Sequence, residues 1–308
     1  MYEDYFGLRE KPFSITPDAD FLFLSDKHLA TLAAIEYGVF EQSGITVITG
    51  EIGAGKTTLI RHLLSTASYG DIRIGLVSNV QRSLGNLLQW VAIALELHTG
   101  ELELTNMQSF KRLQNYLIHE YSQGRRVVLV IDEAQNMSTE SLEELRMLMN
   151  INADKNQLLQ IVLVGQPQLL DTLQKPELAQ FAQRVSSEFH LSALDLEETH
   201  DYIISRLESA GCEDDKLFDR EAVEVIYYFS AGLPRLINTL CDYALVAAYG
   251  SDSKNVTFDI ALDAVKHKRI GGISRHSAAP CGADKIRKNI LKREGVDVSN
   301  FGARWSRG

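Results

Sequence analysis

The stretch Gly50-Glu51-Ile52-Gly53-Ala54-Gly55-Lys56-Thr57 contains every fixed position of the phosphate-binding pattern G-x-x-x-x-G-K-[ST]. A β-branched run at 45–49 precedes it and predicts a buried strand, and a helical pattern over 56–67 follows it. This strand-loop-helix context is the one that the pattern requires, and it disfavours the alternative of a glycine-rich turn with an unrelated lysine. Glycines let backbone N–H groups turn toward phosphate oxygens, and the helix N-terminus adds partial positive charge. We therefore predict a nucleotide phosphate site, whose residues are Gly50, Glu51, Ile52, Gly53, Ala54, Gly55, Lys56, Thr57 and Thr58.

Two acidic residues, Asp132 and Glu133, follow an unbroken apolar run at 127–131. In proteins with such a phosphate loop, an Asp at this place helps to hold Mg²⁺ together with the loop hydroxyl, here that of Thr57, while Lys56 reaches the β- and γ-phosphates. A Glu beside it can accept a proton from an attacking water, so Glu133 favours hydrolysis over transfer to a small acceptor. An exposed acidic strand end is the alternative, and the phosphate loop about 75 residues upstream disfavours it.

Polar residues follow two further predicted strands. Gln166 comes after an apolar strand at 158–164, and Asn79 after one at 72–78. Residues at the carboxyl ends of parallel strands line the ligand crevice of open α/β sheets, so Gln166 could orient the attacking water. A solvated loop amide is the alternative for each residue, and only for Asn79 does it weigh as much as a role in the site.

The order of the predicted elements indicates an α/β fold with a parallel sheet, followed by an all-helical domain. Further helices are expected at about 29–42, 83–97, 106–122 and 138–150, and a short last strand at 187–191. After position 194 only helical patterns occur, at roughly 195–210, 219–230, 234–249 and 257–268. Ser138, Asp195 and Asp219 are the expected N-caps.

Composition excludes several other classes of protein. The chain has 308 residues, 45% hydrophobic and 23% charged, which is ordinary for a globular protein. No apolar run approaches the ~18 residues of a membrane span, and the first residues are acidic where a signal peptide would be basic. Three cysteines suit neither a disulfide framework nor a metal site, so we expect a reduced, cytoplasmic protein.

Charge is divided unevenly along the chain. Residues 266–308 contain 11 Lys/Arg and three Asp/Glu, a net charge of +8, which leaves −18 for residues 1–265. The acidic body argues against binding nucleic acid over its whole surface. The basic tail could touch nucleic acid, an acidic partner or anionic lipid, but glycine and proline breaks favour a solvated, disordered segment over 269–308.

Together these motifs resemble an AAA+ ATPase, and more narrowly the general secretion pathway protein A (ExeA-like) family, with relatives in pilus and exopolysaccharide export. The resemblance covers about residues 1–268. It rests on residues 5–8, 11–13, 16–18, 21–22, 28, 49–58, 131–136, 165–167 and 232–238.

The resemblance implies roles for residues that spacing alone leaves open. Lys56 and Thr57 match Walker A, Asp132 and Glu133 match Walker B, and Gln166 matches sensor 1, where many relatives have Asn. Two arginines that spacing alone would leave solvated also gain roles. Arg184 resembles an arginine finger that reaches a neighbouring subunit's nucleotide, and Arg235, in Gly232-Leu233-Pro234-Arg235, resembles the sensor 2 arginine of a helical lid.

The resemblance implies an N-terminal segment at 1–43 near the nucleotide site, whose part around Phe21–His28 would lie against adenine. An ATPase core at 44–194, a helical lid at 195–268 and the tail would follow. Secretion members of the family often continue into a membrane helix and a peptidoglycan-binding domain. The sequence printed here has neither, which puts direct cell-wall binding in doubt.

Three functions remain open at this point. The first is an ATP- and Mg²⁺-dependent ATPase, active as a homo-oligomeric ring or filament, that drives assembly of an envelope secretion or surface-polymer system. It would be cytoplasmic, or peripheral at the inner membrane through a partner. The second is an ATP-dependent DNA-binding regulator of transposition or replication type, and the third is a scaffold that hydrolyses nucleotide slowly.

Overall fold

The structure is a computed structural model of the chain. It describes residues 1–15, 21, 23–40, 44–66, 72–78, 87–97, 106–153, 156–268 and 283–294. The chain divides into two compact units, one of residues 26–192 and one that combines residues 1–25 with 193–308. Asn79, Cys281 and most of the basic tail, which figure in the sequence analysis, lie outside the described residues.

The first unit is built on a five-stranded sheet whose order is β2-β3-β6-β1-β7 and in which every pairing is parallel. The strands are β1 (Ile45–Gly50), β2 (Ile72–Val77), β3 (Arg126–Ile131), β6 (Leu159–Gly165) and β7 (Val185–Leu191). Strands β1, β3 and β6 are buried almost throughout, as unbroken apolar runs predict for the centre of a parallel sheet. The α/β fold class is thereby confirmed.

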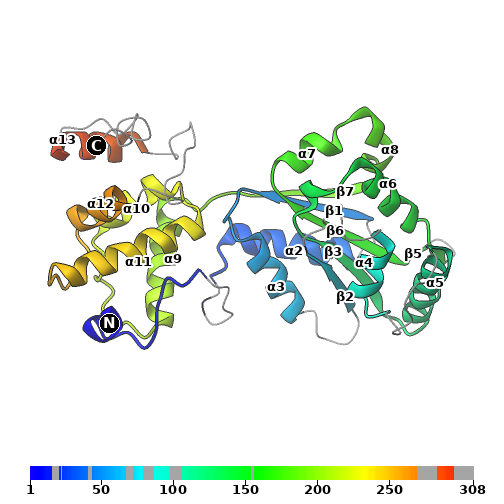
Figure 1. Ribbon diagram of the computed structural model, residues 1–308, viewed down its shortest axis with the longest axis horizontal. Helices are drawn as coiled ribbons and strands as arrows, with labels where there is room; N and C mark the ends of the chain where they lie inside the picture. Colours follow the sequence, from blue (N-terminus) through cyan, green and yellow to red (C-terminus); the bar gives the residue numbers. More distant parts are fainter. Residues whose placement is uncertain are drawn as a thin grey trace. The chain divides into compact units, whose positions relative to one another are not determined.

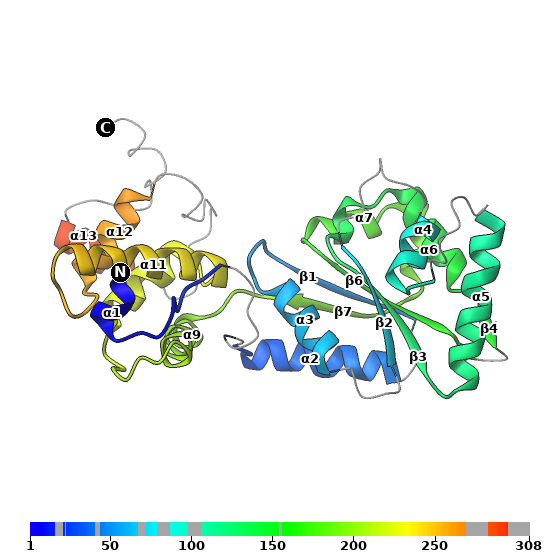
Figure 2. The same cartoon turned by 60° about the horizontal axis from the view of Figure 1, so that its bottom comes forward.

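Helices cover both faces of this sheet (Figure 2). On one face lie α2 (Asp26–Phe40) and α3 (Lys56–Thr66). The other face packs in one apolar cluster against the remaining helices of the unit. These are α4 (Leu87–Ala94), α5 (Asn106–Ser122), η1 (Ala134–Asn136), α6 (Thr139–Leu148), α7 (Gln168–Leu173), η2 (Pro176–Leu178) and α8 (Ala179–Ala182). A small hairpin of β4 (Asn152–Ala153) and β5 (Asn156–Gln157), which we did not expect, precedes β6.

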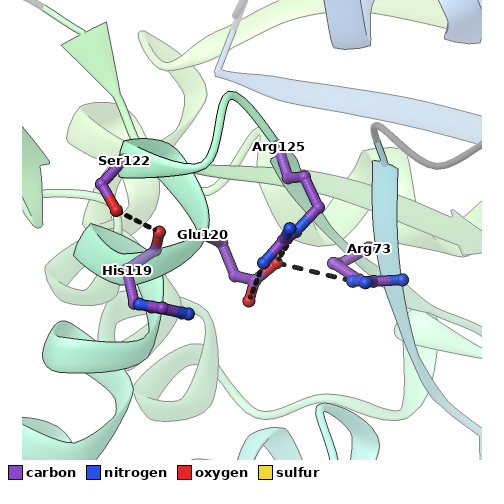
Figure 3. A network of polar contacts seen from close by, with 5 residues as sticks. All are labelled: Arg73, His119, Glu120, Ser122 and Arg125. Atoms are coloured by element: carbon purple, nitrogen blue, oxygen red, sulfur yellow. Dashed lines mark hydrogen bonds and ion pairs between the residues drawn. The ribbon is translucent and has the colours of Figure 1, made fainter.

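A buried carboxylate fixes the end of α5 against the sheet (Figure 3). Glu120 accepts hydrogen bonds from Nε of Arg125 at 2.5 Å and from its Nη2 at 3.0 Å. Nε of Arg73, on β2, lies 3.5 Å from the same carboxylate. The bonds from Arg125 hold the pKa of Glu120 below its ordinary value. This bidentate ion pair links the turn before β3 to the last turn of α5, so it stabilises the packing of α5 beside the sheet.

The second unit is helical (Figure 1). Its elements are α1 (Tyr2–Phe6), α9 (Leu196–Ser209), α10 (Arg220–Ser230), α11 (Pro234–Gly250), α12 (Phe258–His267) and α13 (Ala283–Glu294). The four helices expected after position 194 correspond to α9–α12. Ser138 caps α6, and Asp195 caps α9 in a reciprocal capping box with Glu198. Asp219 precedes α10 without a side-chain capping bond.

The structure divides the opening residues between the two units. Residues 1–25 group with the helical unit, whereas we expected one segment over 1–43 near the nucleotide site. Tyr2, Leu8, Phe13 and Phe21 are buried in the core of the helical unit. Arg206 of α9 explains why this irregular segment stays in place. Its guanidinium is buried and donates to the carbonyl oxygens of Pro12 at 2.6 Å, Ser14 at 3.0 Å and Phe21 at 3.3 Å.

Helix α13 corrects the expectation of a disordered tail for its twelve residues. Ile286 and Ile290, one helical turn apart, are buried in the core of the helical unit. Arg293 donates to Glu221 of α10 at 2.8 Å and lies over the ring of Phe258. The many charged residues of this segment obscured its apolar face in the sequence. That face consists of only two residues, which are enough to dock a short helix on an existing core.

Candidate nucleotide site

The phosphate loop joins β1 to α3 and has the backbone that its glycines were expected to allow. Gly53 and Gly55 have φ angles of +84° and +100°, which side chains disfavour. A Cβ on Gly55 would also lie 2.9 Å from Nε2 of His28, a buried residue in the first turn of α2. A Cβ on Gly50 would lie 2.7 Å from the carbonyl oxygen of Leu191. The loop is therefore held closely on both sides.

Lys56 is buried at the start of α3, and its ammonium group turns back onto the loop. Nζ donates to the carbonyl oxygens of Gly50 at 2.7 Å and of Glu51 at 2.9 Å. Burial lowers the pKa of Lys56, while the nearby carboxylates of Glu133, Asp132 and Glu51 act in the opposite direction. The ammonium thus occupies a place where a phosphate oxygen could replace loop carbonyls as its partner.

Asp132 and Thr57 meet across the site. Oγ1 of Thr57 donates to Oδ2 of Asp132 at 3.2 Å, and Oδ1 accepts the backbone N–H of Glu133 at 2.9 Å. Burial raises the pKa of Asp132, and these two hydrogen bonds oppose the rise. A hydroxyl and a buried carboxylate are oxygen ligands of the kind that Mg²⁺ takes, usually with water and substrate phosphates as its other ligands. These two residues therefore fit the metal that the loop pattern implies.

Glu133 follows Asp132 with a left-handed backbone, at φ +55°. Its Oε2 accepts hydrogen bonds from the side-chain amides of Gln135 at 2.5 Å and of Gln166 at 3.4 Å. Gln166 directly follows β6, and its side-chain amide there reaches the Glu133 carboxylate. Gln135 has no role in the prediction from sequence, where it is simply a polar residue two positions after Glu133.

The strand register explains why these distant residues meet. Thr49 pairs with Gly165, and Ile131 pairs with Leu163. The carboxyl ends of β1, β3 and β6 therefore lie at one edge of the sheet, where α/β proteins bind ligands. This edge unites Lys56, Thr57 and Thr58 of the loop with Asp132, Glu133 and Gln166.

Arg184 lies outside this cluster. The carbonyl of Arg184 accepts the N–H of Ile45, the first residue of β1, so Arg184 lies at the opposite edge of the sheet, about 17 Å of strand from Gly50. Its Nη2 donates to Asn150 at 3.3 Å. Arg235 is in the first turn of α11, in the helical unit. The stretch expected against adenine is also divided, because Phe21 lies under the guanidinium of Arg206 in the helical unit, whereas His28 contacts the loop.

Among the described residues, no helix is long and apolar enough to cross a membrane, and no three His, Cys, Asp or Glu side chains are grouped as a metal site.

Known proteins share the sequence of this region. Residues 40–173 match a family model described as an AAA domain. The chain is 36% identical over 266 residues to the general secretion pathway protein A of Aeromonas hydrophila, which covers 86% of this chain and 48% of that protein. The chain thus spans about half the length of the curated relative it matches.

Solved structures share the fold at low sequence identity. The ORC2 protein of Aeropyrum pernix, solved with ADPNP and ADP, superposes with a TM-score of 0.61 at 16% identity, over 84% of this chain and 71% of that chain. The RuvB branch migration motor of Thermotoga maritima superposes at 0.50 and 18% identity, over 92% and 84%. Residues 40–173 thus form an AAA domain, and the chain is similar to general secretion pathway protein A.

Proposed function

We propose that the chain binds ATP with Mg²⁺ and hydrolyses it to ADP and phosphate. The observation that carries this proposal is the single cluster of Lys56, Thr57, Asp132, Glu133 and Gln166 at the carboxyl edge of the sheet. The loop N–H groups and Lys56 would bind the phosphates, and Thr57 and Asp132 would hold Mg²⁺, which neutralises phosphate charge when bound.

In this site the carboxylate of Glu133 takes a proton from water, whose oxygen bonds to the γ-phosphorus as the bond to the ADP oxygen breaks. Gln166 lies beside the same carboxylate and would orient that water. The experiment is Glu133→Gln, which keeps the shape of the side chain but removes its basicity. ATP binding should persist and turnover should fall by at least about 100-fold; turnover at the wild-type rate would refute the assignment of the base.

We also propose that the active form is a ring or filament in which Arg184 serves a neighbour's nucleotide. Its position at the opposite edge of its own sheet supports a role in trans, and a guanidinium suits a transferring phosphoryl group. Arg235 would neutralise phosphate charge from the lid.

Mixing tests the trans arrangement directly. Arg184→Ala protein retains an intact Glu133, and Glu133→Gln protein retains an intact Arg184, so interfaces between the two would contain one complete site. The mixture should turn over faster than the sum of its inactive components. A mixture of Arg184→Ala and Arg184→Gln proteins is the control, and a rate no higher than that control would exclude the trans role.

The relationship to general secretion pathway protein A supports a role in assembling or remodelling an envelope secretion, pilus or exopolysaccharide-export system. We place the protein in the cytoplasm, or at the inner membrane through a partner. Turnover that rises when membranes from the source organism are added, and that fails to rise with Glu133→Gln protein, would support this role.

A second candidate is DNA binding, favoured by one feature of α13. Lys285, Lys288 and Lys292 are exposed and, at spacings of three and four residues, line the helix face away from the buried isoleucines. Their change to Gln should weaken binding of duplex DNA and reduce its salt dependence by up to three phosphate contacts. Gln at the exposed Lys111, Lys175 and Lys216 gives the same charge change elsewhere. No binding by the full chain at low salt removes this function.

A further inference from the structure

The side-chain amide of Gln135 connects the base of the site to the end of a neighbouring strand. Nε2 of Gln135 donates to Oε2 of Glu133 at 2.5 Å, while its Oε1 accepts the backbone N–H of Gln166 at 3.0 Å. Both ends of the amide are therefore used, and each holds a different part of the site. An apolar residue of the same size could fill the space but could make neither bond.

The surroundings of Gln135 leave its amide little freedom. A Cβ on Gly165, the last residue of β6, would lie 2.9 Å from Oε1 of Gln135 and 3.3 Å from its backbone nitrogen. The backbone of β6 therefore comes close to this side chain at a position that has none of its own. Gln135 itself lies in η1, the short helix that follows Glu133 directly.

Glu133 is held from its main chain as well. Its φ of +55° is uncommon for a residue with a side chain and costs about 1 kcal/mol or more. Its N–H is bound by Oδ1 of Asp132. Within the part of the chain that the structure describes, both side-chain bonds to the Glu133 carboxylate go to Oε2, and Oε1 receives none.

We propose that Gln135 is a positioning residue for hydrolysis. By occupying Oε2, its amide leaves Oε1 as the oxygen that accepts the proton of water, and its bond to Gln166 keeps that oxygen in fixed register with the end of β6. This role rests on the hydrolysis proposed above. Small errors in the placement of a base cost up to about 100-fold in rate, so a side chain that touches no substrate can still set kcat.

Two variants separate the two ends of the amide. Gln135→Glu keeps an acceptor for the N–H of Gln166 but sets a carboxylate oxygen against Oε2 of Glu133, and Gln135→Ala removes both bonds. In both variants kcat should fall at least about tenfold while the Kd of a fluorescent ATP analogue stays within about threefold. Gln168→Glu, an exposed glutamine of α7, adds the same charge nearby and should leave kcat within about twofold. A wild-type kcat for Gln135→Ala would overturn the proposal.

A double-mutant cycle tests the contact without nucleotide or turnover. The urea midpoints of unfolding are measured for wild type, Glu133→Ala, Gln135→Ala and the double variant. The double shift should be smaller than the sum of the single shifts, because either change alone already breaks the shared bond. Additive shifts would overturn the contact on which the proposal rests. Coupled midpoints with no wild-type turnover would instead refute hydrolysis, and the positioning role with it, while leaving the contact standing.

Discussion

The hydroxyl of Thr57 donates to the carboxylate of Asp132 across 3.2 Å, although 75 positions separate them in the chain. The contact forms because β1 and β3 both flank β6 and end at the same edge of the sheet. The fold itself therefore places two oxygens of the kind that Mg²⁺ takes side by side, so the entropy of bringing them together is lost during folding.

Asp132→Asn should therefore remove the metal-dependent part of nucleotide affinity. With Mg²⁺ present, ATP binding should weaken about tenfold or more, whereas binding measured in excess chelator should change little. Fluorescence titration in both conditions checks this. Asp171→Asn, at an exposed position of α7, is the control, and an equal loss with and without Mg²⁺ would argue against Asp132 as a metal ligand.

Gly55→Ala should abolish phosphate binding for two separable reasons. Alanine at φ +100° is strained by about 1–2 kcal/mol, and its Cβ would also press on His28. Gly124→Ala is the matched control, because Gly124 has φ +75° with nothing within 4 Å of the added carbon. Calorimetric titration with ATP should show loss of binding for the first variant only. Equal affinity in both would contradict both reasons, the backbone strain and the contact with His28.

Arg206→Ala should release the opening segment from the helical unit. Three carbonyl oxygens lose their buried donor, and the free energy of unfolding should drop by about 3 kcal/mol. Limited proteolysis followed by mass spectrometry should show new cleavage within the first 25 residues. Arg220→Ala removes an exposed pair with Glu197 and should change neither measurement. Protection as in the wild type would contradict the anchoring role.

Glu120→Gln should destabilise the α/β unit in a pH-dependent way. Because the pKa of Glu120 is lowered on folding, its ion pair contributes fully above the ordinary value near 4.3 and is lost as pH falls through the lowered pKa. Urea unfolding should show a difference of about 1–2 kcal/mol at pH 7 that shrinks below about pH 4. A difference that stays constant down to pH 3 would exclude the ionised pair as its source.

Much of this fold is predictable from local sequence patterns. The runs 127–131 and 158–164 correspond to β3 and β6 within one residue at each end, because a strand buried on both faces needs continuous apolar sequence. The phosphate loop and the acidic pair were equally easy to recognise in the sequence, since phosphate and metal binding restrict residue type and spacing. Helix α13 was missed because two isoleucines among many charges make a weak periodic signal.

Other parts of the structure could not be predicted from local sequence. Arg206 binds the backbone carbonyls of three residues that precede it by between 185 and 194 positions. Every residue has a carbonyl oxygen, so residue types cannot predict these bonds. Gln135 looks like any polar residue after a strand until the approach of β6 gives its amide two partners. The position of Arg184 likewise follows from the register of β7 beside β1 and not from its neighbours in sequence.

Arg206 holds the opening segment by its main chain. Its three partners there are main-chain oxygens, which every amino acid supplies alike. These bonds place no demand on the side chains of Pro12 and Ser14, whereas Phe13 and Phe21 must also fill the core of the helical unit. Evolution and protein engineering can therefore vary positions 12 and 14 as long as the backbone path is kept, but a residue added or deleted between them would move a carbonyl out of reach of Arg206.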